Sequence, residues 1–444
     1  MKELSVSLDL SGDYSKDITK ARELYNAGIQ AVEIGLNVKN NTVKNEKGEI
    51  RRMTPEEYAK ESEKIISSIP SMSQAILDSG MKVNSYHLPF GGPAMKITSS
   101  NEEERETAIN IVCRCIEASK QFNPSYYVIH GGFFSDLLRL PTSEELQKAT
   151  SEQLAVLSSI LESRNESVEN SIKSIAEIAE RTGVQICVEN LHSANLGCTP
   201  QEHVYIIDKI NSINQGKEDV LPVGAVLDIG HCSNGVKPED EIRALGSRLM
   251  GLHSSDRHIE MDKDYCSTLQ ELLTIQKDSE GNFFYAKDLS EVDVKSRLFA
   301  SMKVGQIRDE HLLPGQGTID YGAVSEALKE INYQGRFNAE VSNDETKASV
   351  ETIGNFGKEL NESLTSVYGP LLNEDKEKTD DTQIQEETSE DEKSGSNEDL
   401  DPAIRDRKLF EEMEKGDPFK NLSEQHVQQV VSVFGSQEDG GLME

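Results

Sequence analysis

The stretch GAVLDIGH at residues 224–231 decides the fold of this chain. Its first four residues carry no polar side chain, an acidic residue ends the run, and Gly230 follows where a turn is expected. Short apolar runs bounded by turn signals predict the buried strands of a parallel sheet. Seven further stretches of this kind occur, so the predicted strands are residues 4–8, 31–35, 82–87, 126–130, 185–189, 224–228, 249–253 and 336–340.

Long segments with helical periodicity separate these strands. Thr54 and Thr199 each precede a proline and stand three residues before a glutamate, a pattern that predicts a helix N-cap with a capping box. Gly28, Gly80 and Gly183 follow helical patterns, where a left-handed C-cap residue is expected. Eight alternating strand–helix units favour an α/β fold, a (β/α)8 TIM barrel, over the alternative of a doubly wound open sheet.

Two insertions and a tail depart from the repeat. Residues 38–53 form a polar loop rich in lysine and arginine, and either a solvated loop or a contact with a sugar phosphate explains it. Residues 259–307 are an insertion after the seventh strand, placed to act as a lid or a dimer contact unless it is a neutral excursion. We therefore divide the chain into a barrel at 1–368, a disordered acidic linker at 369–402 and a short helical tail at 403–444.

Charge and cysteine usage limit the classes of function. The formal net charge is −33, and a strongly acidic surface disfavours non-specific nucleic-acid binding. No apolar run approaches the length of a bilayer crossing, and no signal-peptide core opens the chain, so we expect a cytoplasmic protein. The six cysteines include no C-x-x-C pair and predict buried or free thiols rather than a disulfide framework: Cys113, Cys115, Cys187, Cys198, Cys232 and Cys266.

Ionisable residues end one predicted strand after another. All carboxyl ends of a closed parallel barrel lie on one face, so these side chains converge on one site. Burying several unpaired carboxylates together is prohibitive unless a cation balances them. Mixed imidazole and carboxylate ligands suit manganese, zinc, cobalt or iron, whereas an all-oxygen site favours magnesium. The residues concerned are His87, His130, Glu189, Asp228, His231, His253 and Glu340.

Several of these motifs resemble the xylose isomerase-like barrel superfamily, in particular its sugar-phosphate isomerase and epimerase members. The most specific is Asp-Glu-His-Leu-Leu-Pro-Gly at 309–315, and the resemblance covers roughly residues 1–368. The other matching stretches are His-Leu-Pro-Phe at 87–90, Val-Ile-His-Gly-Gly at 128–132, Val-Glu-Asn-Leu at 188–191, Leu-Asp-Ile-Gly-His at 227–231, Leu-His-Ser-Ser-Asp at 252–256 and Ala-Glu-Val at 339–341.

The resemblance implies an isomerase of carbohydrate metabolism that depends on a divalent metal: manganese, cobalt, magnesium or zinc. The metal polarises a carbonyl and its adjacent hydroxyl on a sugar or sugar phosphate. The catalytic pair, Glu189 and Glu340, then moves a proton through an enediolate. The expected metal ligands are Glu189, Asp228, His253 and Glu340, and the expected substrate-binding residues are His87, His130, His231 and His311. A homodimer is a further expectation from the resemblance.

Two other functions remain open at this stage. A trinuclear zinc phosphodiesterase of the endonuclease IV type, which acts on abasic DNA, uses a ligand pattern that the chain also fills. Its further ligands would be His87, His130, His231, Asp309 and His311. The acidic charge and the absence of tryptophan argue against DNA. The alternative of a different class is an inactive barrel whose helical tail docks a protein partner, and such a tail is also compatible with an active enzyme.

Overall fold

A computed structural model gives the structure of the chain. The structure describes residues 4–9, 14–36, 42–44, 50–134, 151–192, 195–232, 236–258, 275–277, 283–285 and 310–341. The chain divides into two units, Met1–Glu374 and Asp375–Glu444, and the second lies wholly outside the described residues. The acidic linker and the helical tail predicted from the sequence therefore lie outside the described residues, and both stay predictions.

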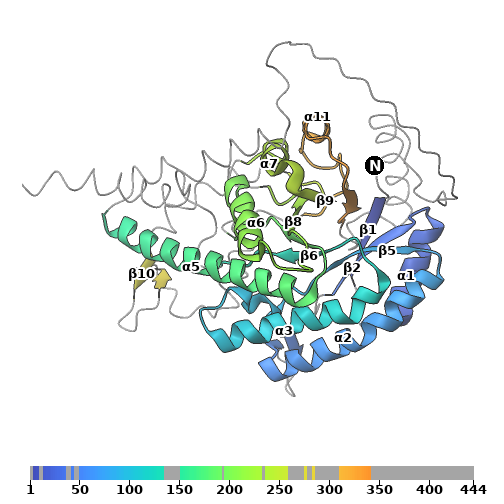
Figure 1. Ribbon diagram of the computed structural model, residues 1–444, viewed down its shortest axis with the longest axis horizontal. Coiled ribbons are helices and arrows are strands. Elements are labelled where there is room, and N and C mark those ends of the chain that lie inside the picture. The colour runs from blue at the N-terminus through green and yellow to red at the C-terminus, as the bar shows by residue number, and fades with distance from the viewer. Residues whose placement is uncertain are drawn as a thin grey trace, which may run out of the picture. The chain divides into compact units, whose positions relative to one another are not determined.

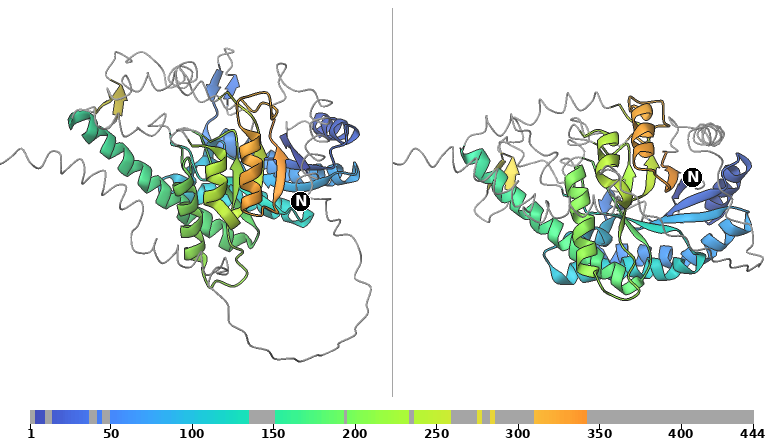
Figure 2. Two further views of the ribbon diagram at one scale, coloured as in Figure 1. Left: turned by 90° about the horizontal axis from the view of Figure 1, so that it is seen from above. Right: turned by 45° about the horizontal axis from the view of Figure 1, so that its top comes forward.

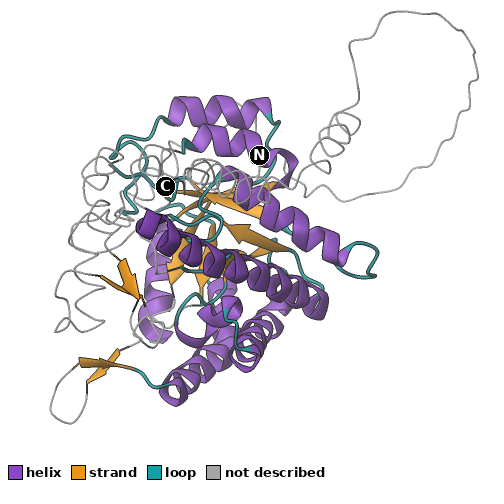
Figure 3. Ribbon diagram, turned by 90° about the vertical axis from the view of Figure 1, so that its left-hand side faces the viewer, coloured by secondary structure: helices purple, strands orange, loops and turns teal. Residues whose placement is uncertain are grey.

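Eight parallel strands form a closed barrel, as predicted, so the open doubly wound sheet is excluded. The first strand pairs with the last, Val6 opposite Ala339, and this pairing closes the ring. Figures 1 and 3 show the strands at the centre with helices packed around them. In barrel order the strands are β1 (Leu4–Asp9), β2 (Ala31–Gly35), β5 (Lys82–His87), β6 (Tyr126–His130), β7 (Ile186–Glu189), β8 (Gly224–Asp228), β9 (Leu249–Ser254) and β12 (Arg336–Ala339).

Helices surround the barrel. Figure 2 shows α5 as the longest of them, with its N-terminal part reaching well beyond the strands. The apolar faces of the helices and the outward faces of the strands form one continuous core. The α-helices that the structure describes are α1 (Tyr14–Asn26), α2 (Pro55–Asp78), α3 (Glu102–Ser119), α5 (Ser151–Thr182), α6 (Pro200–Asn214), α7 (Pro238–Leu245) and α11 (Tyr321–Glu330).

The two predicted capping boxes differ in the structure. At the start of α2, the Thr54 hydroxyl accepts a hydrogen bond from Glu57 N, and Thr54 N donates to the Glu57 carboxylate at 2.9 Å, so the box is complete. Thr199 caps α6 by accepting from Glu202 N, but the Glu202 carboxylate turns inward. It is held there by the Arg164 guanidinium and by Gly197 N at 2.7 Å. A buried ion pair therefore takes the place of the second predicted capping interaction.

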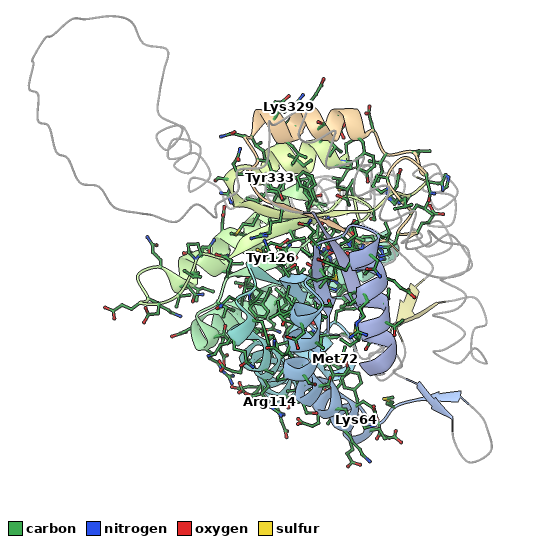
Figure 4. The ribbon with its side chains drawn as sticks, turned by 90° about the vertical axis from the view of Figure 1, so that its right-hand side faces the viewer. Lys64, Met72, Arg114, Tyr126, Lys329 and Tyr333 are labelled. Atoms are coloured by element: carbon green, nitrogen blue, oxygen red, sulfur yellow. The ribbon has the colours of Figure 1, made fainter. Side chains whose placement is uncertain are left out.

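A second, smaller apolar cluster fills the barrel interior. Tyr126, Val128, Cys187 and Val226 form it, and Met250 packs against it. A β-carbon on Gly251 would meet the Tyr126 hydroxyl, so glycine leaves room for this ring. Figure 4 shows Tyr126 among the elements of the barrel. Residues two apart on a strand share a face, so the next inward side chains carry the chemistry: His130, Glu189 and Asp228.

Two short hairpins lie within the predicted insertions. β3 (Thr42–Lys44) pairs with β4 (Ile50–Arg52) in the basic loop, and this hairpin projects from the barrel in Figures 3 and 4. β10 (Ile275–Lys277) pairs with β11 (Phe283–Tyr285) in the insertion after the seventh strand, and β10 contacts α5. The remainder of residues 259–307 lies outside the described residues, so its predicted role as a lid or dimer contact stays a prediction.

The structure also bears on the predictions about thiols and membranes. Five cysteines are free and buried, as predicted: Cys113, Cys115, Cys187, Cys198 and Cys232. Cys266 lies outside the described residues. Among the helices that the structure describes, none combines the length and the apolar character that crossing a bilayer requires.

Candidate metal centre

The strand register brings the predicted site residues together at one end of the barrel. His130 at the end of β6 lies opposite Glu189 at the end of β7. Asp228 at the end of β8 lies opposite His253 on β9. Glu340 follows β12 directly, one residue beyond the strand rather than within it as predicted. The parallel pairing of these strands thus places the side chains close together at the carboxyl ends of the strands.

His253 lies at the centre of the site. Its Nδ1 is 3.1 Å from Glu189 Oε1 and 2.6 Å from Glu340 Oε2. Burial opposes the imidazolium form of His253, but the surrounding charges of Glu33, Glu189 and Glu340 raise its pKa well above the usual value. For Glu340, the same pairing with His253 outweighs burial and lowers the carboxyl pKa to about 2.

The donor set fits a divalent cation. Glu189, Asp228, His253 and Glu340 each offer a ligand atom, and these four atoms all lie within 4.8 Å of one another. A single imidazole nitrogen carries at most one proton, so His253 Nδ1 cannot satisfy both carboxylates that approach it. Asp228 Oδ2 is buried and has no hydrogen-bond partner among the described residues. Excess negative charge and an unsatisfied carboxylate oxygen are what a bound cation would balance.

Asp228 is held in place on its other side. Its Oδ1 accepts hydrogen bonds from Gly230 N at 2.6 Å and from the Ser255 hydroxyl at 2.9 Å. The Asn190 side chain binds the Asp228 backbone twice, accepting from Asp228 N at 2.7 Å and donating to Asp228 O at 3.0 Å. Burial raises the pKa of the Asp228 carboxyl. These contacts fix the carboxylate and leave Oδ2 directed toward the other ligands.

His87 and His130 contact the second oxygen of Glu189. Their Nε2 atoms lie 3.0 Å and 3.1 Å from Glu189 Oε2. These three residues form a second group of ligand type that shares Glu189 with the first. Burial is the largest influence on both histidines: it lowers the pKa of His130, whereas contact with Glu189 overcomes it at His87 and raises that pKa to about 9.

The remaining predicted histidines lie on the opposite flank. His231 lies with Nε2 3.6 Å from Asp228 Oδ2, and its Nδ1 lies 2.9 Å from Asn190 O. The His231 and His311 rings are 6.0 Å apart, and His311 Nδ1 donates to Glu340 O at 2.8 Å. His192, which the sequence analysis did not single out, lies 5.4 Å from the His231 ring. Asp309 lies outside the described residues.

Glu33 is a buried carboxylate that the sequence analysis missed. It lies in the middle of β2, 1% exposed, and contacts His253 Nε2 at 3.0 Å through Oε1. The Ser85 hydroxyl donates to Glu33 Oε2 at 2.7 Å, and the Asn338 amide donates to Oε1 at 3.2 Å. Its signal in the sequence is an isolated acidic residue between apolar neighbours in a predicted strand.

An apolar pocket adjoins the site beside His130. The Phe90 ring stacks on the imidazole with centroids 4.7 Å apart, and Phe133 meets it edge-on at 5.3 Å. His130 is the one polar side chain among the residues that line this pocket, and its Nδ1 is buried without a hydrogen-bond partner among the described residues. An apolar pocket therefore borders the site next to the end of β6.

A closed parallel barrel with carboxylates and imidazoles at its carboxyl end defines a (β/α)8 barrel with a candidate metal centre. The sequence model of the xylose isomerase-like TIM barrel family matches residues 22–361, and the chain belongs to that family.

The individual proteins to which the chain is similar share little sequence identity with it. An uncharacterised protein from Methanocaldococcus jannaschii is 24% identical over 259 residues, which are 58% of this chain and 64% of that protein's length. A D-tagatose 3-epimerase-like protein is 18% identical, with 82% of this chain and 98% of that chain covered and a TM-score of 0.47. A D-psicose 3-epimerase from Clostridium cellulolyticum H10 is 15% identical over 82% and 98% of the two chains, with a TM-score of 0.45. At these sequence identities and TM-scores, the similarity supports no conclusion about the activity of this chain.

Proposed function

We propose that the chain is a divalent-metal-dependent isomerase or epimerase of a sugar or sugar phosphate. The observation that carries the proposal is the convergence of Glu189, Asp228, His253 and Glu340 ligand atoms within 4.8 Å at the carboxyl end of the barrel. Membership of the xylose isomerase-like family supports the same reading. The residues that would hold the metal are these four, and the bound cation would act as a Lewis acid toward a carbonyl oxygen and its neighbouring hydroxyl.

The protein's own side chains would transfer the proton, bind the substrate and line the site. Glu189 and Glu340 both approach His253 Nδ1, so a substrate beside the cation would have two carboxylates within reach that could take and return a proton. His231, whose Nδ1 is held by Asn190 O, would bind a substrate oxygen through Nε2. His130 and Phe90, whose rings stack, would border the substrate on its apolar side.

Metal content tests this proposal directly. We expect about one manganese or cobalt ion per chain by elemental analysis, lost in Glu189→Gln and retained in His311→Ala. The metal-loaded protein should then interconvert at least one ketose in a panel of free and phosphorylated sugars, with exchange of a substrate C–H for solvent deuterium. Absence of metal from the wild-type protein after loading and dialysis would exclude the proposal.

A trinuclear zinc phosphodiesterase remains a second candidate because one observation favours it. His87, His130 and Glu189 form a ligand group that shares Glu189 with the first group, as a bridged pair of metal ions requires. The net charge of −33 opposes binding to DNA. Close to three zinc ions per chain, reduced in His311→Ala, together with cleavage of an abasic-site duplex, would establish this function in place of the isomerase.

A further inference from the structure

Glu33 contacts His253, one of the proposed metal ligands, and is not itself in the ligand set. It contacts His253 on the ring nitrogen opposite the one that faces Glu189 and Glu340, with Glu33 Oε1 and Oε2 at 3.0 Å and 3.3 Å from Nε2. Since metal-binding at Nδ1 needs a lone pair there, the single proton of a neutral imidazole must then sit on Nε2. A carboxylate beside Nε2 is the partner that such a proton requires.

Hydrogen bonds from neighbouring side chains hold the Glu33 carboxylate beside His253 Nε2. Ser85 donates to Oε2 and Asn338 to Oε1, and neither residue belongs to the ligand set. The Ser5 hydroxyl in turn donates to Asn338 Oδ1 at 2.9 Å, and Asn84 donates to the Ser5 oxygen at 3.1 Å. These residues come from β1, β5 and β12, so a layer of hydrogen bonds across the barrel fixes the position of Glu33.

We propose that Glu33 is a positioning residue for the metal centre: it accepts the Nε2 proton of His253, selects the tautomer that binds metal through Nδ1, and strengthens that nitrogen as a ligand. This inference rests on the proposed metal-dependent function. A carboxylate behind a ligating histidine orients the ring and raises its basicity, and its loss typically weakens metal affinity by about 10–100-fold.

The test compares metal affinity with fold stability in the full-length protein. Titration calorimetry with Mn²⁺ or Co²⁺ should show binding about 10–100-fold weaker in Glu33→Gln than in the wild type. The matched control is Glu202→Gln, a buried glutamate held by Arg164 away from the ligand set. We expect it to lower the thermal midpoint without changing metal affinity. The Co²⁺ absorption spectrum should change in Glu33→Gln and not in Glu202→Gln.

Two outcomes separate this inference from the proposed function. If the wild type binds metal and a folded Glu33→Gln binds it with equal affinity, the role of Glu33 is excluded and the metal centre stands. If the wild type binds none, both proposals fail. Should Glu33→Gln not fold, ¹⁵N-histidine NMR of the Zn²⁺-loaded wild type decides: a protonated Nε2 on His253 supports the inference, and an unprotonated one overturns it.

Discussion

Asp256 accepts a hydrogen bond from the backbone of Gly317, with Asp256 Oδ2 2.9 Å from Gly317 N. The same carboxylate accepts from Gly315 N at 2.8 Å and from Ile319 N at 3.2 Å. A β-carbon on Gly317 would meet Asp256 Oδ1 and the Arg257 backbone, so only glycine allows this close approach. Asp256 therefore organises the loop that follows His311.

Replacing Asp256 should destabilise this loop. Asp256→Ala removes the acceptor of four backbone N–H groups, those of Arg257, Gly315, Gly317 and Ile319. The bonds from Arg257 and Ile319 are buried, and an unsatisfied buried donor costs about 1–3 kcal/mol. We expect a clear fall in the thermal midpoint measured by differential scanning fluorimetry. Asp256→Asn keeps one acceptor oxygen and should fall less. Equal midpoints for wild type and Asp256→Ala would show that the loop does not depend on this carboxylate.

The buried pair of Arg164 and Glu202 should contribute far more to stability than an exposed pair. Arg164→Ala leaves Glu202 as an uncompensated buried charge, which costs about 3–5 kcal/mol. Lys217, which pairs with Glu180 at the surface, serves as the control, and Lys217→Ala should cost at most about 1 kcal/mol. Urea unfolding monitored by circular dichroism measures both. A similar loss in the two variants would contradict the distinction.

Metal addition should stabilise the folded protein. A ligand at about 100 times its Kd adds roughly 2.7 kcal/mol, which corresponds to a rise of roughly 5 °C in Tm. We expect Mn²⁺ or Co²⁺ to produce such a rise, EDTA to reverse it and Glu189→Gln to abolish it. The acidic surface makes this variant the essential control, because an equal rise in Glu189→Gln would place the cation elsewhere on the chain.

The described cysteines should resist thiol reagents in the native state. Burial raises the pKa of Cys113 to about 11 and those of Cys115 and Cys198 to about 12, so little thiolate forms at pH 8. In a Cys266→Ser variant we expect no rapid reaction with Ellman's reagent at that pH, and five thiols after denaturation in guanidinium. Rapid reaction of two or more thiols in the native variant would show that the helices open.

Much of the barrel was predictable because its strands are buried on both faces. Runs such as 224–228 and 31–35 contain too few polar residues to be mistaken for exposed segments, and their predicted limits agree with the structure. The hairpin of β3 and β4 escaped prediction, because Thr42–Lys44 and Ile50–Arg52 show neither an apolar run nor a clear alternation. In the structure β3 and β4 pair with each other in a two-stranded sheet separate from the barrel.

The candidate site was predictable only where residues end strands. The position of Asp228 at a strand end indicates the carboxyl face of the barrel, and the structure places it opposite His253. Glu33 lies in mid-strand, and its closeness to His253 depends on β2 and β9 facing each other across the barrel, a relationship that no sequence spacing encodes. Glu202 was assigned to a cap because local spacing does not reveal Arg164, 38 residues earlier in the chain.

The pairing of β1 with β12 joins residues that are more than 330 positions apart, since Leu4 lies opposite Phe337. Glu340 follows directly on that last strand, so the proposed ligand set is complete only when the ring has closed. Such distant contacts form late and slowly in folding, because the entropy of a long loop must be lost first. On the ribosome, a nascent chain that has not yet made its last strand therefore lacks the complete proposed ligand set. Binding of the metal ion would then report that the barrel has closed, which is the last step of folding.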